Sequence, residues 1–278
     1  MFFLCYIGFE IKPMAAIVMI AVAAVEGIHF IGKLLKKQIV WKKSVLACCL
    51  SAVLGIGAAA GGVSAVVDSL HFPVVTDTVL GWQHHMMLGL NKDTNGGYSQ
   101  ADFDYSTSFS SAEEQHAAEL KKIGKRLKDF GVGGYLQHFV KKSARNYFDG
   151  CFGWGGLGET FYTEIFPERG TVLCSLIRSL YYDNTEDTLY RYPALFRQIL
   201  WYMVLVLVPF SVFTKRPLDK KRQVAVLSVL GLMLYLQIFE AHARYLYTFV
   251  PIFVFLATEG IDNLREYLNQ KSERRVKK

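Results

Sequence analysis

Five apolar windows constrain this chain more than any other feature of its sequence. A helix needs roughly 20 mostly apolar residues to cross the hydrocarbon of a bilayer, and each window approaches or exceeds that length. The windows are Met14–Ile31, Ser44–Val67, Leu195–Phe213, Gln223–Phe239 and, just long enough, Tyr245–Ile261. With 52% hydrophobic residues, the chain is more apolar than an average soluble domain. We therefore predict an all-α membrane protein with about five full transmembrane helices.

Residues 1–9 are also apolar, but they are too short to span a bilayer alone. They lack the basic start and the small-residue cleavage site of a signal peptide. We interpret them as the remnant of a transmembrane helix whose beginning is missing. Pro13 suits the start of the next helix, because it has no backbone N–H to lose there.

The distribution of Lys and Arg in the loops predicts a topology. Basic residues concentrate in residues 32–43, 214–222 and 262–278, and the positive-inside rule places these segments in the cytoplasm. Residues 68–194, with 12 Lys/Arg against 16 Asp/Glu, then form an external domain. We thus expect a multi-pass protein of the cell (plasma) membrane with spans at 1–67 and 195–261. The net charge of +7 is mostly a topological signal, so no nucleic acid is expected as a partner.

The predicted external domain is too long to be a structureless loop. A helix-like run, Gly81–Leu90, carries His84 and His85, but adjacent histidines point to different faces of a helix and make no metal pair by themselves. Asn95-Gly-Gly-Tyr98 indicates a tight turn. The glycine-rich loop at 149–158 lacks the Lys-Ser/Thr of a Walker motif, which argues against nucleotide binding.

Two amphipathic helices follow in the same region. Ser111-Ala-Glu-Glu114 has capping-box spacing, and we expect the helix that it begins to end at Gly131–Gly134. The next helix opposes an apolar face to Lys141, Lys142 and Arg145, which are expected either on a solvated face or on anionic headgroups. A disulfide between Cys151 and Cys174 is left open, since two cysteines alone are weak evidence.

Glu240, His242 and Arg244 fall within five residues between two apolar windows. Charge is costly at bilayer depth, so we expect these side chains at the rim of the hydrocarbon. An ordinary interfacial turn and a site for a bound anion are both compatible with this pattern.

Several stretches resemble the bacterial GT-C membrane glycosyltransferases, relatives of the protein O-mannosyltransferases. They are Gly81-Trp-Gln-His-His-Met-Met-Leu-Gly-Leu-Asn91 followed by Gly96-Gly-Tyr-Ser and Asp102, Ile11-Lys-Pro13, and Glu240-Ala-His-Ala-Arg-Tyr-Leu-Tyr247. The resemblance implies an enzyme that transfers a sugar from a polyprenyl-phosphate carrier at the outer membrane face. Polyprenyl-phosphate sugar lipid and membrane lipids are the implied partners, with no cofactor and no metal.

The resemblance also implies roles for particular residues. Arg244 and Tyr245 would bind the donor phosphate, since a guanidinium meets phosphate oxygens through paired donors. Acceptor-binding or orienting roles would fall to Glu240, His242, His84 and His85. The family's catalytic Asp lies in the first external loop, and no such segment precedes the first full span here. The chain is therefore expected to be a C-terminal portion completed by a missing N-terminal half or a companion subunit.

Four carboxylates in the predicted external domain do not match the family's catalytic position, so that role is not transferred to them. They are Asp68, Asp77, Asp102 and Asp104. Two other classes stay open: a non-catalytic membrane protein whose external domain binds a ligand or partner, and a piece of a transporter. Transport would require paired charges near mid-membrane, and only Glu26 comes close.

Overall fold

The computed structural model of the chain is helical throughout the part that it describes, residues 2–36, 43–71, 80–153, 171–181, 189–214 and 217–276. No β-strand occurs in those residues. The predicted all-α membrane fold is thereby confirmed. Parts of the predicted basic loops, residues 37–42 and 215–216, and of the glycine-rich loop, residues 154–158, lie outside the described ranges.

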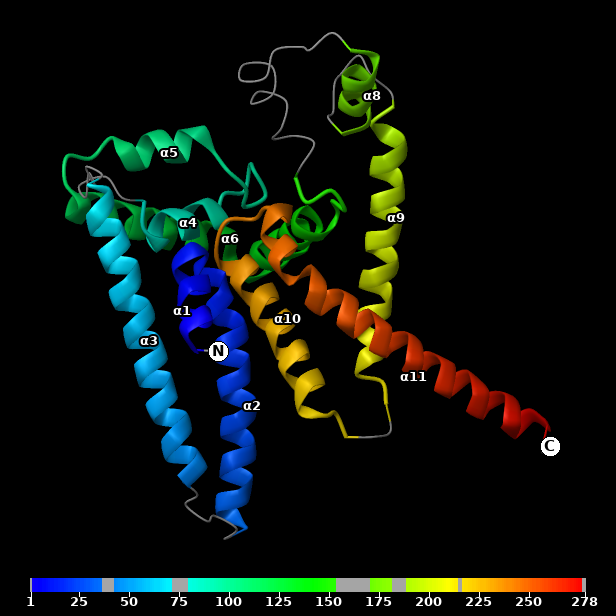
Figure 1. Cartoon of the computed structure of the whole chain (residues 1–278). Coiled ribbons are helices and arrows are strands. Elements are labelled where there is room, and N and C mark those ends of the chain that lie inside the picture. The colour runs from blue at the N-terminus through cyan, green and yellow to red at the C-terminus, as the bar shows by residue number, and fades with distance from the viewer. Residues whose placement is uncertain are drawn as a thin grey trace. The chain divides into compact units, whose positions relative to one another are not determined.

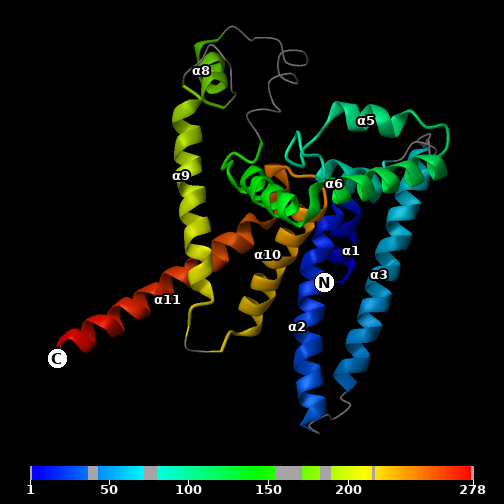
Figure 2. The same cartoon turned by 180° about the vertical axis from the view of Figure 1, so that it is seen from behind.

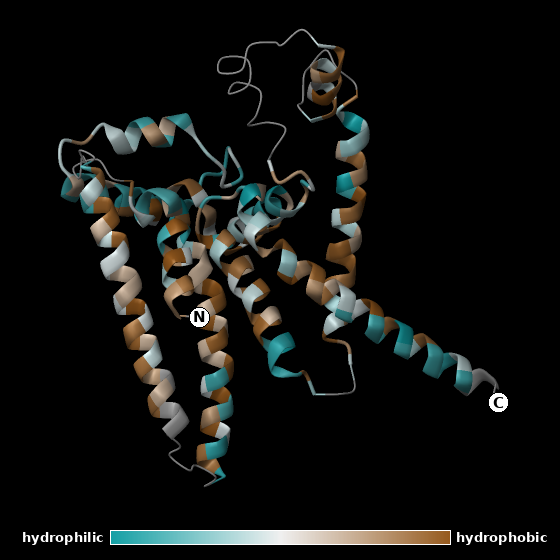
Figure 3. Ribbon diagram, in the orientation of Figure 1, coloured by the Kyte–Doolittle hydropathy of each residue, from teal (hydrophilic) through white to brown (hydrophobic). Residues whose placement is uncertain are grey.

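Five helical segments among the described residues are long and apolar enough to cross a membrane, one for each predicted window. They are Pro13–Leu35, Cys49–Leu70, Arg191–Ser211, Lys220–Ile238 and Ala243–Glu273. Figure 3 shows apolar residues dominating most of these helices, whereas the end of the last one becomes hydrophilic toward the C-terminus. The side of the membrane that each loop faces, and the predicted domain boundaries, stay predictions.

The chain divides into two compact units, the first made of Met1–Asp77 and Leu218–Met233. It contains α1 (Phe2–Ile11), η1 (Pro13–Ala15), α2 (Ala16–Leu35), α3 (Lys43–Leu70) and the first part of α10 (Lys220–Ile238) (Figure 1). Lys220 pairs with Glu26 at 2.7 Å. His29 and Gln223 share a hydrogen bond of 3.1 Å. Glu26, the residue closest to what the transport interpretation requires, is thus exposed and paired with the first residue of a candidate span rather than with a charge at mid-span.

The second unit comprises Thr78–Pro217 and Leu234–Lys278 and holds the end of α10 with eight further helices among the described residues. These are α4 (Trp82–Gly89), α5 (Gln100–Thr107), α6 (Ala112–Tyr147), α8 (Val172–Tyr181), α9 (Arg191–Leu207), η3 (Val208–Ser211), η4 (Ala243–Phe249) and α11 (Val250–Val276). Figures 1 and 2 show α6 running across the direction of α9. Asn263 fastens α11 to η3 by donating to the carbonyls of Phe210 and Ser211, at 2.9 and 3.1 Å.

Local signals in the sequence account for the shape of α6. The Ser111 hydroxyl accepts a hydrogen bond from the Glu114 backbone N–H, as the capping-box spacing predicts. Gly131, at φ 56°, kinks the helix, a backbone conformation that costs glycine little. The helix resumes directly after Gly131, so the predicted break is one residue rather than four. We call residues 132–147 the second half of α6.

Candidate functional site

The turn between α10 and η4 carries the residues that the sequence singled out, and main-chain contacts fix it. The Ala241 N–H donates to the Gly96 carbonyl at 2.7 Å. Arg145 Nε donates to the Ala241 carbonyl at 3.4 Å. The turn is thus held between the loop at Asn95–Gly97 and the second half of α6.

Glu240 is buried in this turn and is partnered by two side chains. Tyr245 Oη donates to Glu240 Oε2 at 2.8 Å, and His85 Nδ1 lies 3.7 Å from the same oxygen. Burial alone would raise the pKa of Glu240, but the hydrogen bonds from His85 and Tyr245 and the charge of Arg244 outweigh it, so its pKa lies below the ordinary value. Glu240 is therefore a carboxylate at neutral pH that holds Tyr245 in place.

Arg244 is exposed beside this carboxylate. Its guanidinium carbon lies 5.4 Å from the centre of the Tyr245 ring. Among the described residues the guanidinium forms no ion pair with a carboxylate, although its charge acts on nearby Glu240. Arg244 can therefore offer its donors outward.

His242 shapes the start of η4. Its Nδ1 accepts a hydrogen bond from the Arg244 backbone N–H at 3.2 Å, which caps the helix. Burial lowers the pKa of His242, and the charges of Arg244 and Arg145 lower it further. The imidazole is thus kept neutral, the form in which Nδ1 can accept.

Arg145 belongs to this cluster, although the sequence placed it only on a basic helix face. A side chain at Gly97 would come within 2.5 Å of the Arg145 guanidinium, so glycine there leaves the room that the guanidinium fills. Arg145 and Arg244 both act on the pKa of His242. Two positive side chains, from α6 and η4, therefore lie close to the same turn. The Asn95-Gly-Gly sequence was the available clue, but it indicated only a turn.

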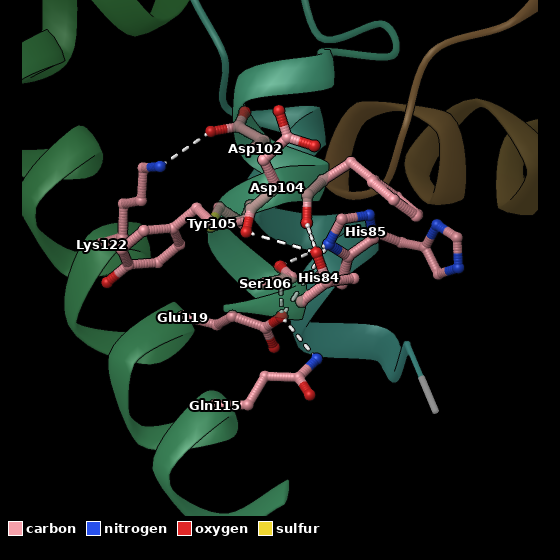
Figure 4. A network of polar contacts seen from close by, with 12 residues as sticks. His84, His85, Asp102, Asp104, Tyr105, Ser106, Gln115, Glu119 and Lys122 are labelled. Atoms are coloured by element: carbon pink, nitrogen blue, oxygen red, sulfur yellow. Dashed lines mark hydrogen bonds and ion pairs between the residues drawn. The ribbon is translucent and has the colours of Figure 1, made fainter. Parts of the chain in front are cut away.

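His84 does not join the cluster, because it points into a buried polar network on the other side of α4 (Figure 4). Its Nδ1 lies 2.7 Å from Ser106 Oγ, which in turn donates to Glu119 Oε1 at 2.7 Å. Gln115 Nε2 donates to the same carboxylate oxygen at 3.1 Å. The Ser106 proton thus goes to a carboxylate rather than to histidine, which does not activate serine as a nucleophile. Burial lowers the pKa of His84, which favours its neutral form.

Asp102 is the centre of a second buried network. Both of its oxygens accept from Arg126, at 2.8 and 3.0 Å, and Lys122 and Asn91 add contacts of 2.9 and 2.7 Å. Burial would raise the pKa of Asp102, but the hydrogen bonds from Arg126, Lys122 and Asn91 lower it overall. Asp102 is a fully engaged carboxylate that ties α5 to α6 and to the loop after α4.

Lys142 corrects the prediction of a basic surface on this helix, because its side chain is completely buried. Its Nζ donates to the carbonyls of Gly89 at 2.8 Å and of Gln237 at 2.9 Å. These carbonyls belong to the last turns of α4 and α10, where unsatisfied acceptors and the helix dipoles favour a donor. Burial lowers the pKa of Lys142 to about 7.

Cys151 and Cys174 are free thiols, so the disulfide that the sequence left open is not formed. Within the described ranges, no three His, Cys, Asp or Glu side chains are grouped to hold a metal ion.

The apolar spans and the charged turn at their ends define the class of this molecule, an α-helical integral membrane protein. Comparison with family models agrees: the chain belongs to a family described as conserved hypothetical integral membrane protein, whose model matches residues 1–263. No curated protein and no solved structure matches the chain.

Proposed function

We propose that this membrane protein acts in sugar transfer from a polyprenyl-phosphate donor, and that Arg244 binds the donor phosphate. The observation that carries the proposal is the exposed Arg244 guanidinium beside the Tyr245 ring, with no carboxylate partner among the described residues. A guanidinium stays charged near lipid and meets phosphate oxygens through two parallel donors. The resemblance of residues 81–102 and 240–247 to GT-C glycosyltransferases supplies the reaction class.

The surroundings of Arg244 support a phosphate in three ways. The contacts of Glu240 within hydrogen-bond or ion-pair distance are with Tyr245 and His85, which leaves the guanidinium of Arg244 without an ion pair. Arg145 adds a second positive charge near the same turn. Tyr245 can anchor the start of a membrane span at headgroup level, where a lipid phosphate resides. In this arrangement His85, Glu240 and His242 position the turn, and an acceptor would approach on their exposed side.

The experiment compares polyprenyl-phosphate binding by purified wild type, Arg244→Ala and Arg244→Lys in nanodiscs. A hydrogen bond to a charged group contributes roughly 1.5–3 kcal/mol, so Arg244→Ala should weaken binding about tenfold or more. Arg244→Lys should recover only part of the affinity, because an ammonium keeps the charge but lacks the planar fork. Lys141→Ala, which removes an exposed charge from α6, is the matched control and should bind as wild type does.

Equal affinity of all four proteins would contradict the assignment of Arg244. Absence of any polyprenyl-phosphate binding by folded wild type would favour the alternative function, a non-catalytic membrane protein that binds another ligand or partner.

A further inference from the structure

The second half of α6 has polar side chains on its buried side and large apolar side chains on its exposed side, the reverse of a helix on the surface of a water-soluble protein. Its buried positions are polar: His138, Lys142 and Asn146 repeat every four residues and are 4%, 0% and 0% exposed. Its exposed positions include a row of large apolar side chains. They are Val132 at 83%, Leu136 at 62%, Phe139 at 39% and Val140 at 66% exposed.

These four residues, which we call the apolar face, lie on one side of the helix. Spacings of three, four, seven and eight residues bring side chains onto one face of an α-helix. Polar exposed residues, Gln137 and Lys141, lie beside this face rather than within it. A contiguous apolar row that faces outward indicates a surface covered by something other than water.

Contacts of the same helix join it to the last turn of one candidate span, α10, and to aromatic residues within two others, α9 and α11. Ser143 Oγ accepts from Gln237 Nε2 at 2.8 Å, in the last turn of α10. Tyr147 stacks edge-on against Phe253 of α11, with ring centres 6.4 Å apart. The Tyr147 carbonyl accepts from Trp201 Nε1 at 2.9 Å, and the Phe148 carbonyl accepts from Tyr202 Oη at 3.3 Å.

The residues of α9 that contact the second half of α6 lie where headgroups are expected to meet acyl chains. Arg197 and Gln198 are the last charged or amide residues of α9, and Trp201 and Tyr202 come about one turn later, after Ile199 and Leu200. Tryptophan and tyrosine gather at the boundary between headgroups and acyl chains. The second half of α6 is joined to this pair of aromatic residues, so it lies near that boundary.

We infer that the apolar face of α6 is inserted into the lipid bilayer, so that residues 132–147 form an interfacial helix lying along the membrane surface. Figures 1 and 2 agree with this, because α6 runs across the direction of the span α9. An amphipathic helix of this kind buries its apolar side in the headgroup and acyl boundary while its polar side faces water or protein. The buried Lys142 then satisfies helix ends inside the protein, and lipid covers the apolar face. This inference does not depend on the proposed function.

Nitroxide accessibility tests the inference in nanodiscs of phosphatidylethanolamine and phosphatidylglycerol. Single labels are placed at Leu136 and Val140 on the apolar face, and at Lys141 beside it, in protein whose native cysteines are replaced. Val206 of α9 and Lys121 of the first half of α6 provide the lipid and water references, both being exposed. We expect labels at Leu136 and Val140 to collide with oxygen far more than with a water-soluble nickel chelate, as a label at Val206 should, and the label at Lys141 to show the reverse.

Two outcomes would overturn the inference. Nickel accessibility at Leu136 and Val140 equal to that at Lys121 would mean that the face is in water. Protection from both reagents would mean that a second copy of the chain or another protein covers it. If the cysteine-free protein does not fold, Leu136→Trp and Lys141→Trp in the native background give the same test. Brominated acyl chains should quench the added fluorescence of the first variant and not that of the second.

Discussion

Replacing Lys142 with methionine should change how the stability of this protein depends on pH. Burial lowers the pKa of Lys142 from 10.5 to about 7, whereas the unfolded chain keeps the ordinary value. Between these values the unfolded chain binds more protons than the folded chain, so stability should rise with pH in that window, by at most about 1.4 kcal/mol per pH unit. The charged lysine therefore costs the folded state up to about 5 kcal/mol at or below neutral pH.

Methionine has a similar length and no charge, so the variant should lack this dependence. The substitution removes the hydrogen bond that Lys142 donates to the Gln237 carbonyl, and a buried acceptor left without a partner lowers the free energy of unfolding by about 1–3 kcal/mol. The Gly89 carbonyl keeps a partner, because His138 Nε2 lies 3.0 Å from it. We expect Lys142→Met to be more stable than wild type near neutral pH and less stable near the upper end of the window.

Thermal unfolding followed by circular dichroism, in detergent at matched ionic strength, measures the pH at which the stability curves of wild type and Lys142→Met cross. For a chain of this size about 1 kcal/mol corresponds to roughly 2–4 °C in the unfolding midpoint, so the crossing is resolvable. Lys141→Met is the control, because Lys141 is an exposed neighbour on the same helix and should follow the wild-type pH profile. Parallel profiles of wild type and Lys142→Met would refute the reasoning, since they would mean that Lys142 titrates alike in the folded and unfolded chain.

Two further predictions concern the Asp102 network and the membrane topology. Asp102→Asn leaves the partly buried Arg126 and Lys122 without their carboxylate and should lower the free energy of unfolding by about 3 kcal/mol. Because the pKa of Asp102 is lowered in the folded state, the stability difference between wild type and the variant should shrink as pH falls through the acidic range. Equal unfolding midpoints of wild type and Asp102→Asn at neutral pH would contradict this prediction. The positive-inside rule predicts that an impermeant thiol reagent applied to intact cells labels a single cysteine at position 95 and not one at position 37, and labelling of both would refute the topology.

The spans and the local turns could be predicted from the sequence because both depend on short-range properties. Length and apolarity alone decide whether a helix can cross a bilayer, and all five predicted windows correspond to candidate spans. The Ser111 cap is read within four residues. Asn95 and Gly96, at φ 49° and 80°, adopt the turn that their sequence indicates.

The burial of Lys142 could not be predicted, because the sequence does not say which side of an amphipathic helix faces the protein. Polar residues at 138, 142 and 146 indicate a solvated face when the helix is considered alone. The deciding contacts are carbonyls at the ends of α4 and α10, which come from residues 53 and 95 positions away. Helix ends are acceptors that no hydropathy pattern marks, so a lysine that satisfies them looks like a surface lysine.

The charged turn also depends on a contact between residues that are distant in sequence, which the sequence pattern did not reveal. Glu240, His242 and Arg244 were found because they are close in sequence, whereas Arg145 lies 96 residues before Ala241 and was missed as a neighbour. Two glycines indicate where distant segments approach one another closely. Gly97 gives space to the Arg145 guanidinium, and a side chain at Gly89 would come within 2.6 Å of the Ile238 carbonyl at the end of α10. Where glycine is required for close approach rather than for a left-handed turn, it marks a meeting of distant segments.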